Sequence, residues 1–387
     1  MREEYERRQD ELRRLAAGAG LRGVLAWSRG GSTHDHYADV YYLTGFYQHQ
    51  PAVPDEPGRW QAQGHAALLL PVDGPALLLT GDGESQDPQP AAARLNTPFP
   101  VDALGEQIRL TLPPGRVGVL GCAAMGAPWW CRLRSVLPGH ELVGADDLGH
   151  RMRRIKSPAE QDLLRAAGTL GARAMRAALD AAVPGATEAE SAAAAVAEIV
   201  RGGGAYYGMG VSSGAASHTF AASGPAPYSA ERRLAVGDLF RMDLYGSLGG
   251  YLFDLARTTV VGTEPTAEQR ALLDAVRDSV LAGVEILRPG RRFGEVARRC
   301  QEVFDRSAFV ARHGRPDSQL GGAWGHGLGL SFEPPWIAED GAYADERVEA
   351  GMCVALERRI ALPMVGGANY EDDILVTDTG PEIITPS

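Results

Sequence analysis

Two aspartates lie eleven positions apart among apolar and β-branched neighbours, in the stretch LFRMDLYGSLGGYLFDLARTTVV. They are Asp243 and Asp254. The apolar residues predict a strand around each aspartate, and the glycines between them predict a hairpin. If Leu248 and Gly249 form a two-residue turn, Asp243 lies directly opposite Asp254, with the two Cβ atoms about 5 Å apart. Two carboxylates this close repel each other in a partly buried sheet, so we expect a positive charge between them.

A second pair of acids repeats this arrangement near the C-terminus. Glu357 lies in MCVALERRIAL and Glu371 in ANYEDDILV, and a hairpin centred on Met364 makes them face each other. One histidine, His326, lies in GGAWGHGLGL, where small neighbours let a metal site approach the backbone. Four carboxylates and an imidazole form a hard ligand set whose charge balances two divalent cations. A single aspartate on a strand is more often ion-paired or capping, but two facing pairs beside a histidine predict a metal site.

The order of these residues resembles the pita-bread metallohydrolases, peptidase family M24, which include methionine aminopeptidase, prolidase, aminopeptidase P and the metal-free creatinase. The matching segments lie within residues 237–378 and include GHGLGL, EAGMCVALE and YEDDILVT. The resemblance implies that Asp254 and Glu371 bridge two metal ions. Since every family ligand is present, a creatinase-type loss of metal is not expected. By resemblance, the five ligands of the dinuclear centre are Asp243, Asp254, His326, Glu357 and Glu371.

Composition restricts the class of protein. The chain has 387 residues, enough for two domains, and a net charge of −11, which argues against a nucleic-acid partner. The four cysteines have no CxxC spacing, which fits a reducing compartment. The charged first twenty residues do not resemble a signal peptide, and no apolar run is long enough for a membrane span. We therefore expect a soluble, cytoplasmic protein without a membrane partner.

The pattern of elements indicates two domains, residues 1–150 and residues 151–387. In the first, the short apolar strands GVLAW, AALLL, ALLLT and RVGVL alternate with helices or loops, as in a small α/β domain. Residues 48–63 and 81–100 are rich in proline, glycine and polar residues and are expected to be loops. By resemblance, this first domain is similar to the N-terminal domain of prolidases and creatinases.

The second domain contains a weak internal repeat. Capping boxes at 157–160, 187–190 and 266–269 predict three helices, and a further helix is expected over residues 293–311. Pro-Gly pairs at 184–185 and 289–290 end equivalent helices about 105 residues apart. The resemblance implies a pita-bread α+β domain with a pseudo-twofold repeat and a curved antiparallel sheet around one site.

The expected reaction is hydrolysis of an amide or peptide bond by a metal-bridging hydroxide. By resemblance, Glu357 moves a proton from the water to the leaving nitrogen. His218 is the candidate for a further donor to the tetrahedral intermediate. It lies 25 residues before Asp243, a longer gap than the family shows, so the alternative is a surface loop residue.

The positions that select the substrate depart from the pattern of proline-specific members. Proline-specific members place a second histidine seven residues after the metal histidine and an arginine two residues before the last glutamate. Those positions hold Glu333 and Asn369 here, and they are the predicted substrate contacts. The proline that follows the fourth ligand is Arg358, so Arg358 or Arg359 is a candidate to bind an anionic group, the alternative being an exposed strand arginine. An Xaa-Pro dipeptide and a small non-peptide amide both remain open.

Other classes remain as alternatives. A lyase on the same scaffold would use the metal ligands without consuming water, and a binding protein would have kept the fold without activity. The ligand set accepts Mn²⁺, Co²⁺, Fe²⁺ or Zn²⁺, with Mn²⁺ favoured here. In related prolidases a loop of one subunit can cap the site of the other, so a homodimer is expected, with residues 32–50 as that loop. A separate metal site at His34, His36 and His49 is disfavoured because they lack HxxxH helical spacing.

Lys156 is the only lysine of the chain. Pyridoxal or Schiff-base chemistry would depend on it alone, and its basic surroundings in RMRRIKSPAE predict a solvated linker charge. Neither a P-loop nor a dinucleotide-binding fingerprint is present in the sequence.

Overall fold

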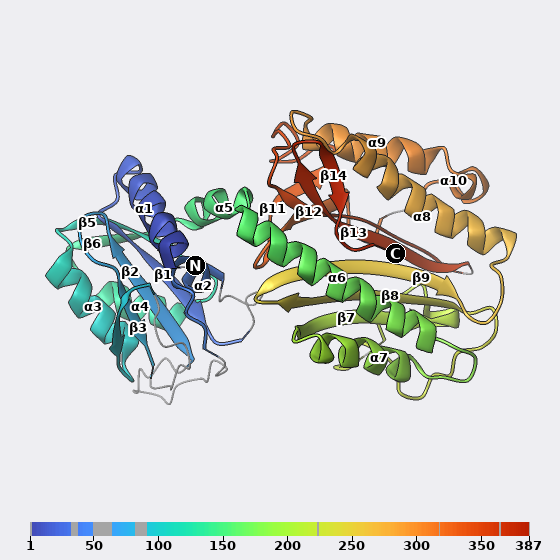
Figure 1. The fold of residues 1–387 in the computed structure, drawn as a ribbon, viewed down its shortest axis with the longest axis horizontal. Coiled ribbons are helices and arrows are strands. Elements are labelled where there is room, and N and C mark those ends of the chain that lie inside the picture. Colours follow the sequence, from blue (N-terminus) through green and yellow to red (C-terminus); the bar gives the residue numbers. More distant parts are fainter. Residues whose placement is uncertain are drawn as a thin grey trace. The chain divides into compact units, whose positions relative to one another are not determined.

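The computed structural model describes residues 2–31, 38–48, 64–81, 91–222, 224–316, 318–363 and 365–386. The chain forms two compact units, residues 1–153 and 154–387, each built around its own sheet (Figure 1). His34, His36 and His49, together with most of the predicted loop over residues 48–63, lie outside the described residues.

The first unit is an α/β domain with a mixed six-stranded sheet in the order β4-β3-β2-β1-β5-β6. Its elements are α1 (Arg2–Gly18), β1 (Gly23–Arg29), α2 (Ala38–Thr44), β2 (His65–Pro71), β3 (Leu77–Thr80), β4 (Ala93–Asn96), α3 (Pro100–Thr111), β5 (Gly115–Leu120), α4 (Ala127–Ser135), β6 (His140–Gly144) and α5 (Asp146–Arg154).

The four apolar strands predicted for this unit are confirmed as β1, β2, β3 and β5. Their side chains, Leu25 and Trp27 among them, form one core with α3 and α4. The prediction of a loop over residues 81–100 is wrong at β4, which pairs in parallel with β3. The ARLN segment alternates apolar and polar residues, but over only four positions, and none of them is buried. So short a pattern does not reveal a strand within a segment rich in proline and glycine.

The second unit holds an antiparallel sheet in the order β11-β10-β12-β13-β9-β8-β7, with β14 paired to β13. Its elements are α6 (Pro158–Ala181), α7 (Glu188–Arg201), β7 (Ala205–Ser213), the 3₁₀ helix η2 (Gly214–Ala216), β8 (Leu239–Leu248), β9 (Tyr251–Val260), α8 (Ala267–Ile286), α9 (Phe293–Asp305), α10 (Ala308–His313), β10 (Ala323–Leu328), β11 (Phe332–Ala338), β12 (Cys353–Leu362), β13 (Gly366–Thr377) and β14 (Gly380–Ile383).

All three predicted capping boxes are confirmed. Ser157, Thr187 and Thr266 each accept a hydrogen bond from the third residue of the helix, whose side chain accepts one in return from the cap backbone. The predicted helix over residues 293–311 is two helices, because Ser307 caps a new one by accepting from the Val310 N–H at 3.2 Å. Local capping chemistry therefore sets most helix starts in this unit.

Each strand of this sheet sends alternate side chains to opposite faces. On one face, Leu244 and Phe253 pack in the α6–α7 half, and Val354 and Leu356 pack in the α8–α9 half. Figure 1 shows α6 and α7 beside β7 to β9, and α8 beside β12 and β13. Two helices and an antiparallel hairpin thus occur twice, and the other face of the sheet is left for polar residues.

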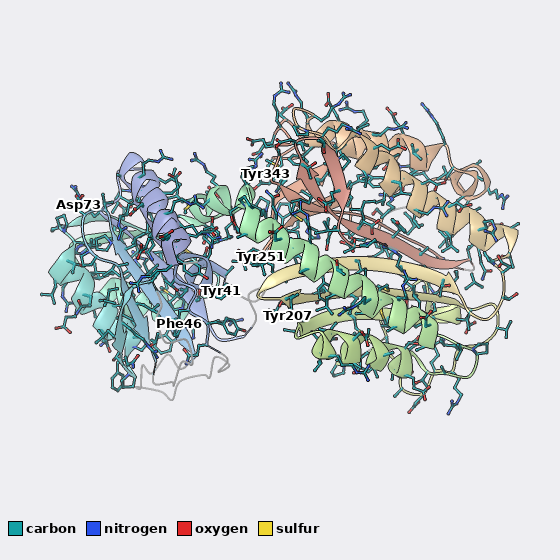
Figure 2. The ribbon with its side chains drawn as sticks, in the orientation of Figure 1. Tyr41, Phe46, Asp73, Tyr207, Tyr251 and Tyr343 are labelled. Carbon is teal, nitrogen blue, oxygen red and sulfur yellow. The ribbon has the colours of Figure 1, made fainter. Side chains whose placement is uncertain are left out.

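The start of α6 is tied to the hairpin of β8 and β9. The hydroxyl of Tyr251, labelled in Figure 2, donates to Glu160 Oε1 at 2.9 Å in the first turn of α6. Glu160 is also the capping-box partner of Ser157, so one carboxylate orients both the helix and the strand end. None of the helices in the described part of the chain combines the length and apolarity that a membrane crossing requires.

Candidate metal centre

Three of the acidic residues lie in a single row across four strands. Asp243 on β8 pairs with Ala256 on β9, Ala256 pairs with Glu371 on β13, and Glu371 pairs with Glu357 on β12. Directly paired residues point to the same face of a sheet, so the three carboxylates share one face. Ala256 contributes only a methyl group between Asp243 and Glu371, which leaves room for a ligand above it.

The predicted pairing of Asp243 with Asp254 is wrong by two residues. Asp254 pairs with Tyr245, because the turn is formed by Gly249 and Gly250 and not by Leu248 and Gly249. Both glycines have positive φ, 59° and 84°, which a tight hairpin requires at its two central positions and which leucine does not readily adopt. The two aspartates still share a face, since the shift is an even number of residues. The facing of Glu357 and Glu371 is confirmed.

His326 on β10 points its Nε2 atom at this group of carboxylates. Nε2 lies 3.5 Å from Asp254 Oδ2 and 3.9 Å from Glu371 Oε1. Its Nδ1 atom lies 3.1 Å from the carbonyl oxygen of Gly327, which can only accept a hydrogen bond. Nδ1 therefore carries the hydrogen, and Nε2 is the nitrogen available to a metal ion.

Two groups of buried ligand atoms have metal-site dimensions. Atoms of Asp254, His326 and Glu371 lie within 4.8 Å of one another, as do atoms of Asp243, Glu357 and Glu371. Glu371 belongs to both groups. The two groups therefore adjoin each other through one carboxylate.

The electrostatics of these residues fit bound cations. Burial and the charge of Asp254 raise the pKa of Asp243 to about 7, and burial with neighbouring carboxylates also raises the pKa values of Glu357 and Glu371. Asp254 Oδ1 and both Glu371 carboxylate oxygens are buried without a hydrogen-bond partner among the described residues. Buried carboxylate oxygens in such numbers require cations or protons.

Arg359, two residues after Glu357, lies among the predicted ligands. Its Nη2 atom is 2.7 Å from Asp243 Oδ2 and 3.4 Å from Glu357 Oε2. The guanidinium carbon also lies 4.1 Å from the centre of the Phe220 ring. The positive charge expected near the paired acids is thus supplied in part by the chain itself. Of the two arginines that the sequence offered, strand periodicity distinguishes Arg359 from Arg358, because residues 357 and 359 share a face.

The structure places Arg358 away from the site, contrary to its prediction as a substrate contact. It faces α9, where its guanidinium carbon lies 4.4 Å from the Phe304 ring centre and 4.1 Å from that of Trp324. Burial lowers its pKa to about 10. The alternative of an exposed strand arginine is also wrong, since Arg358 is 2% exposed.

Glu333, another predicted substrate contact, forms a buried ion pair. Lys156 Nζ lies 3.1 Å from Glu333 Oε1, and the two side chains are 3% and 1% exposed. The prediction that Lys156 is a solvated linker charge is therefore wrong. The two residues are 177 positions apart, so no local pattern indicates their contact.

Asn369 shares the face of Glu371 and lies directly opposite Arg359 on β12. Its side-chain oxygen accepts a hydrogen bond from Thr258 Oγ1 at 2.9 Å. Its Nδ2 atom is buried without a partner among the described residues, which leaves a donor on this face.

His218 is not among the ligand atoms. Its Nδ1 atom lies 2.9 Å from the carbonyl oxygen of Ala215, and its ring lines a cavity of about 490 Å³ that contains none of the five predicted ligands. The loop is nevertheless connected to the site. Gln319 donates to the His218 carbonyl oxygen at 3.2 Å and accepts from Arg241 Nη2 at 2.8 Å.

Asp373 is a supporting residue that the sequence did not single out. Its Oδ2 atom accepts a hydrogen bond from the backbone N–H of Asp254 at 2.9 Å. Burial and the charge of Asp254 raise the pKa of Asp373. The contact fixes the backbone that carries a predicted ligand, as outer carboxylates often do at metal sites.

Replacing Ala256 tests the row directly. In Ala256→Leu, the longer side chain fills the space between Asp243 and Glu371, so we expect bound metal to fall from about two ions per chain to one or fewer. Metal content by mass spectrometry, with circular dichroism to check the fold, measures this. Ala361→Leu, on the same face of β12 but farther along the strand, is the control. Unchanged metal content in Ala256→Leu would contradict the placement of the metal site between Asp243 and Glu371.

The raised carboxylate pKa values make the metal-free protein sensitive to pH. The folded state holds more protons than the unfolded chain between the ordinary pKa of Asp243, 3.8, and its folded value of about 7. The free energy of unfolding therefore falls as pH rises through this window. Cations bind the deprotonated carboxylates, so the stabilisation that bound cations give the folded state grows as pH rises through this window. We expect the Tm of chelator-treated protein to fall between about pH 5 and about pH 7.5 and that of metal-loaded protein not to fall. A rise in the Tm of the metal-free protein over this pH range would refute the raised carboxylate pKa values.

The buried Lys156–Glu333 pair should matter for stability. Glu333→Leu leaves the ammonium buried beside an apolar side chain, and we expect a loss of about 3–5 kcal/mol in the free energy of unfolding. Lys156→Met should cost a similar amount, and the double variant less than the sum, because no unpaired charge remains. Urea unfolding of the four proteins measures the coupling. Additive losses would show that the pair is not coupled.

Comparison with known protein sequences identifies a family match in the second unit. The family model described as metallopeptidase family M24 matches residues 162–378. A Xaa-Pro dipeptidase of Pyrococcus furiosus is 29% identical over 251 residues, which is 63% of this chain and 67% of that protein. The uncharacterized peptidase YqhT of Bacillus subtilis is 30% identical over 257 residues, or 65% and 68% of the two chains.

Solved structures show the same fold along the whole chain. A Xaa-Pro dipeptidase from Bacillus anthracis superposes with a TM-score of 0.78 at 22% identity, covering 99% of this chain and 98% of that one. The dipeptidase PepE from Mycobacterium ulcerans gives a TM-score of 0.74 at 26% identity, covering 100% and 96%. The expected α/β domain followed by a pita-bread domain is thereby confirmed, and these relatives give no support to the lyase alternative. The chain belongs to metallopeptidase family M24 and is a metal-dependent peptide-bond hydrolase.

Proposed function

We propose that the protein is a dinuclear dipeptidase that acts on peptides of the Xaa-Pro class. The observation that carries the proposal is the pair of buried ligand groups that share Glu371. The names of the relatives from Pyrococcus furiosus and Bacillus anthracis support the Xaa-Pro class. We retain the expected ligands Asp243, Asp254, His326, Glu357 and Glu371 for two cations, and Mn²⁺ as the favoured metal.

The chain's own groups divide the remaining tasks. The five predicted ligands would hold two divalent cations, which when bound would supply an activated water and polarise the scissile carbonyl. Glu357, whose pKa is raised by burial, is suited to receive a proton at a carboxylate oxygen and pass it to the leaving nitrogen. His326 holds its hydrogen on Nδ1, so Nε2 stays free for a cation. Asp373 keeps the Asp254 backbone in place.

Further properties form part of the proposal. His218 would reach the intermediate only if its loop moves, because its ring has no contact with the predicted ligands in the described part of the chain. The four cysteines are free, which supports a reducing, cytoplasmic location. A homodimer remains a prediction from the family resemblance.

Metal content and product analysis together test the function. We expect about two ions per wild-type chain, with loss of at least one in Asp254→Ala and in Glu371→Ala, and hydrolysis of Ala-Pro by the loaded wild type only. In water enriched with ¹⁸O, the alanine product should carry one labelled oxygen, which an elimination would not introduce. Bound metal without cleavage of Ala-Pro, Ala-Ala or a simple amide would refute the proposal.

A further inference from the structure

We propose that Arg359 binds the free C-terminal carboxylate of the substrate and thereby selects dipeptides over longer peptides. The inference deepens the proposed dipeptidase function and rests on it. It concerns a side chain in direct contact with two of the predicted ligands, Asp243 and Glu357.

The position of Arg359 suits a group that meets substrate. Its side chain is 16% exposed, the most exposed of the three groups in contact, since those of Asp243 and Glu357 are 6% and 11% exposed. The Phe220 ring covers one face of the guanidinium and is itself 38% exposed. The Nε atom of Arg359 is buried without a hydrogen-bond partner among the described residues. A planar guanidinium held in this way presents donors in the fork geometry that a carboxylate accepts.

Charge explains why this arginine becomes available. Its contacts are with Asp243 and Glu357, which are also the carboxylates of one predicted cation position. Two divalent cations balance the four carboxylates of the centre, so the guanidinium is then left in excess. A poorly hydrated cation that loses its anionic partners gains free energy by acquiring another. The carboxylate of a substrate is the anion that would arrive at that point.

The spacing favours a dipeptide. In a dipeptide the terminal carboxylate carbon is three bonds from the scissile carbonyl carbon, or roughly 3–3.8 Å away. Each further residue moves that carboxylate out by about 3.3–3.6 Å. Because Arg359 touches the predicted metal ligands, it can reach an anion only close to the scissile bond. The carboxylate of a tripeptide would lie beyond it.

Neighbouring arginines do not offer the same group. Arg241 is fully buried, its Nη atoms contact the Ser217 carbonyl oxygen and Gln319, and burial lowers its pKa to about 9. Arg358 packs on the opposite face between Phe304 and Trp324. Arg257 is held by the Glu371 carbonyl oxygen and by Asp372.

The test compares Ala-Pro, Ala-Pro amide and Ala-Pro-Ala with wild type, Arg359→Gln and Arg359→Lys. We expect the kcat/KM of the wild type to be at least tenfold higher for Ala-Pro than for Ala-Pro amide or Ala-Pro-Ala. In Arg359→Gln the KM for Ala-Pro should rise about 10–100-fold, with kcat and the amide reaction little changed, so that the preference disappears. Arg359→Lys should keep part of it, because the charge remains without the fork. Arg358→Gln, on the opposite face, should keep the wild-type preference.

Two measurements without turnover accompany the kinetics. Metal content should be the same in Arg359→Gln as in the wild type, and calorimetry should show proline binding to the loaded wild type at least tenfold more tightly than to the variant. Loss of metal from the variant would overturn the inference, because Arg359 would then support the centre and not the substrate. Equal kcat/KM for Ala-Pro and its amide in an active wild type would overturn it as well. If the wild type cleaves no peptide, the proposed function fails, and the inference that rests on it fails too.

Discussion

One cross-strand pair holds the predicted centre together. Glu371 on β13 opposite Ala256 on β9 is the contact that joins the strands of the two halves, and each half brings its own carboxylates to that seam. Asp243 and Asp254 come from the first hairpin, and Glu357 and Glu371 from the second. If the pair shifted by one residue, one hairpin would turn its acids toward the helices. The register at this single position therefore decides whether a cation site exists.

The same geometry lowers the stability of the protein when no metal is bound. Burial and mutual repulsion raise the pKa values of Asp243, Glu357 and Glu371, and Arg359 offsets only part of the negative charge. The arrangement that suits a metal site therefore destabilises the metal-free protein. Packing on the apolar face of the sheet, which the helices cover, holds the like charges together. Binding of divalent metal would offset this electrostatic cost, because a cation stabilises the ionised carboxylates.

The features that the sequence predicted correctly depend on local chemistry. Capping boxes set the helix starts, and the facing of Glu357 and Glu371 followed from the length of one hairpin. The first hairpin was placed wrongly because three glycines offered several turns, and only the one with positive φ at Gly249 and Gly250 avoids strain. The Lys156–Glu333 pair could not be predicted, because nothing local to either residue indicates a partner so distant along the chain.

At two positions where the chain departs from the proline-specific pattern, the structure places a basic side chain beside the departing residue. An acid stands at Glu333 where those members have a histidine, and the only lysine of the chain is buried against it. An amide stands at Asn369 where they have an arginine, and Arg359 lies directly opposite on the neighbouring strand. A positive charge is thus kept at this point of the sheet face, although it comes from another strand. The sheet face beside the predicted ligands therefore holds two side chains with N–H donors, the Arg359 guanidinium and the Asn369 amide, of which Asn369 Nδ2 has no partner among the described residues.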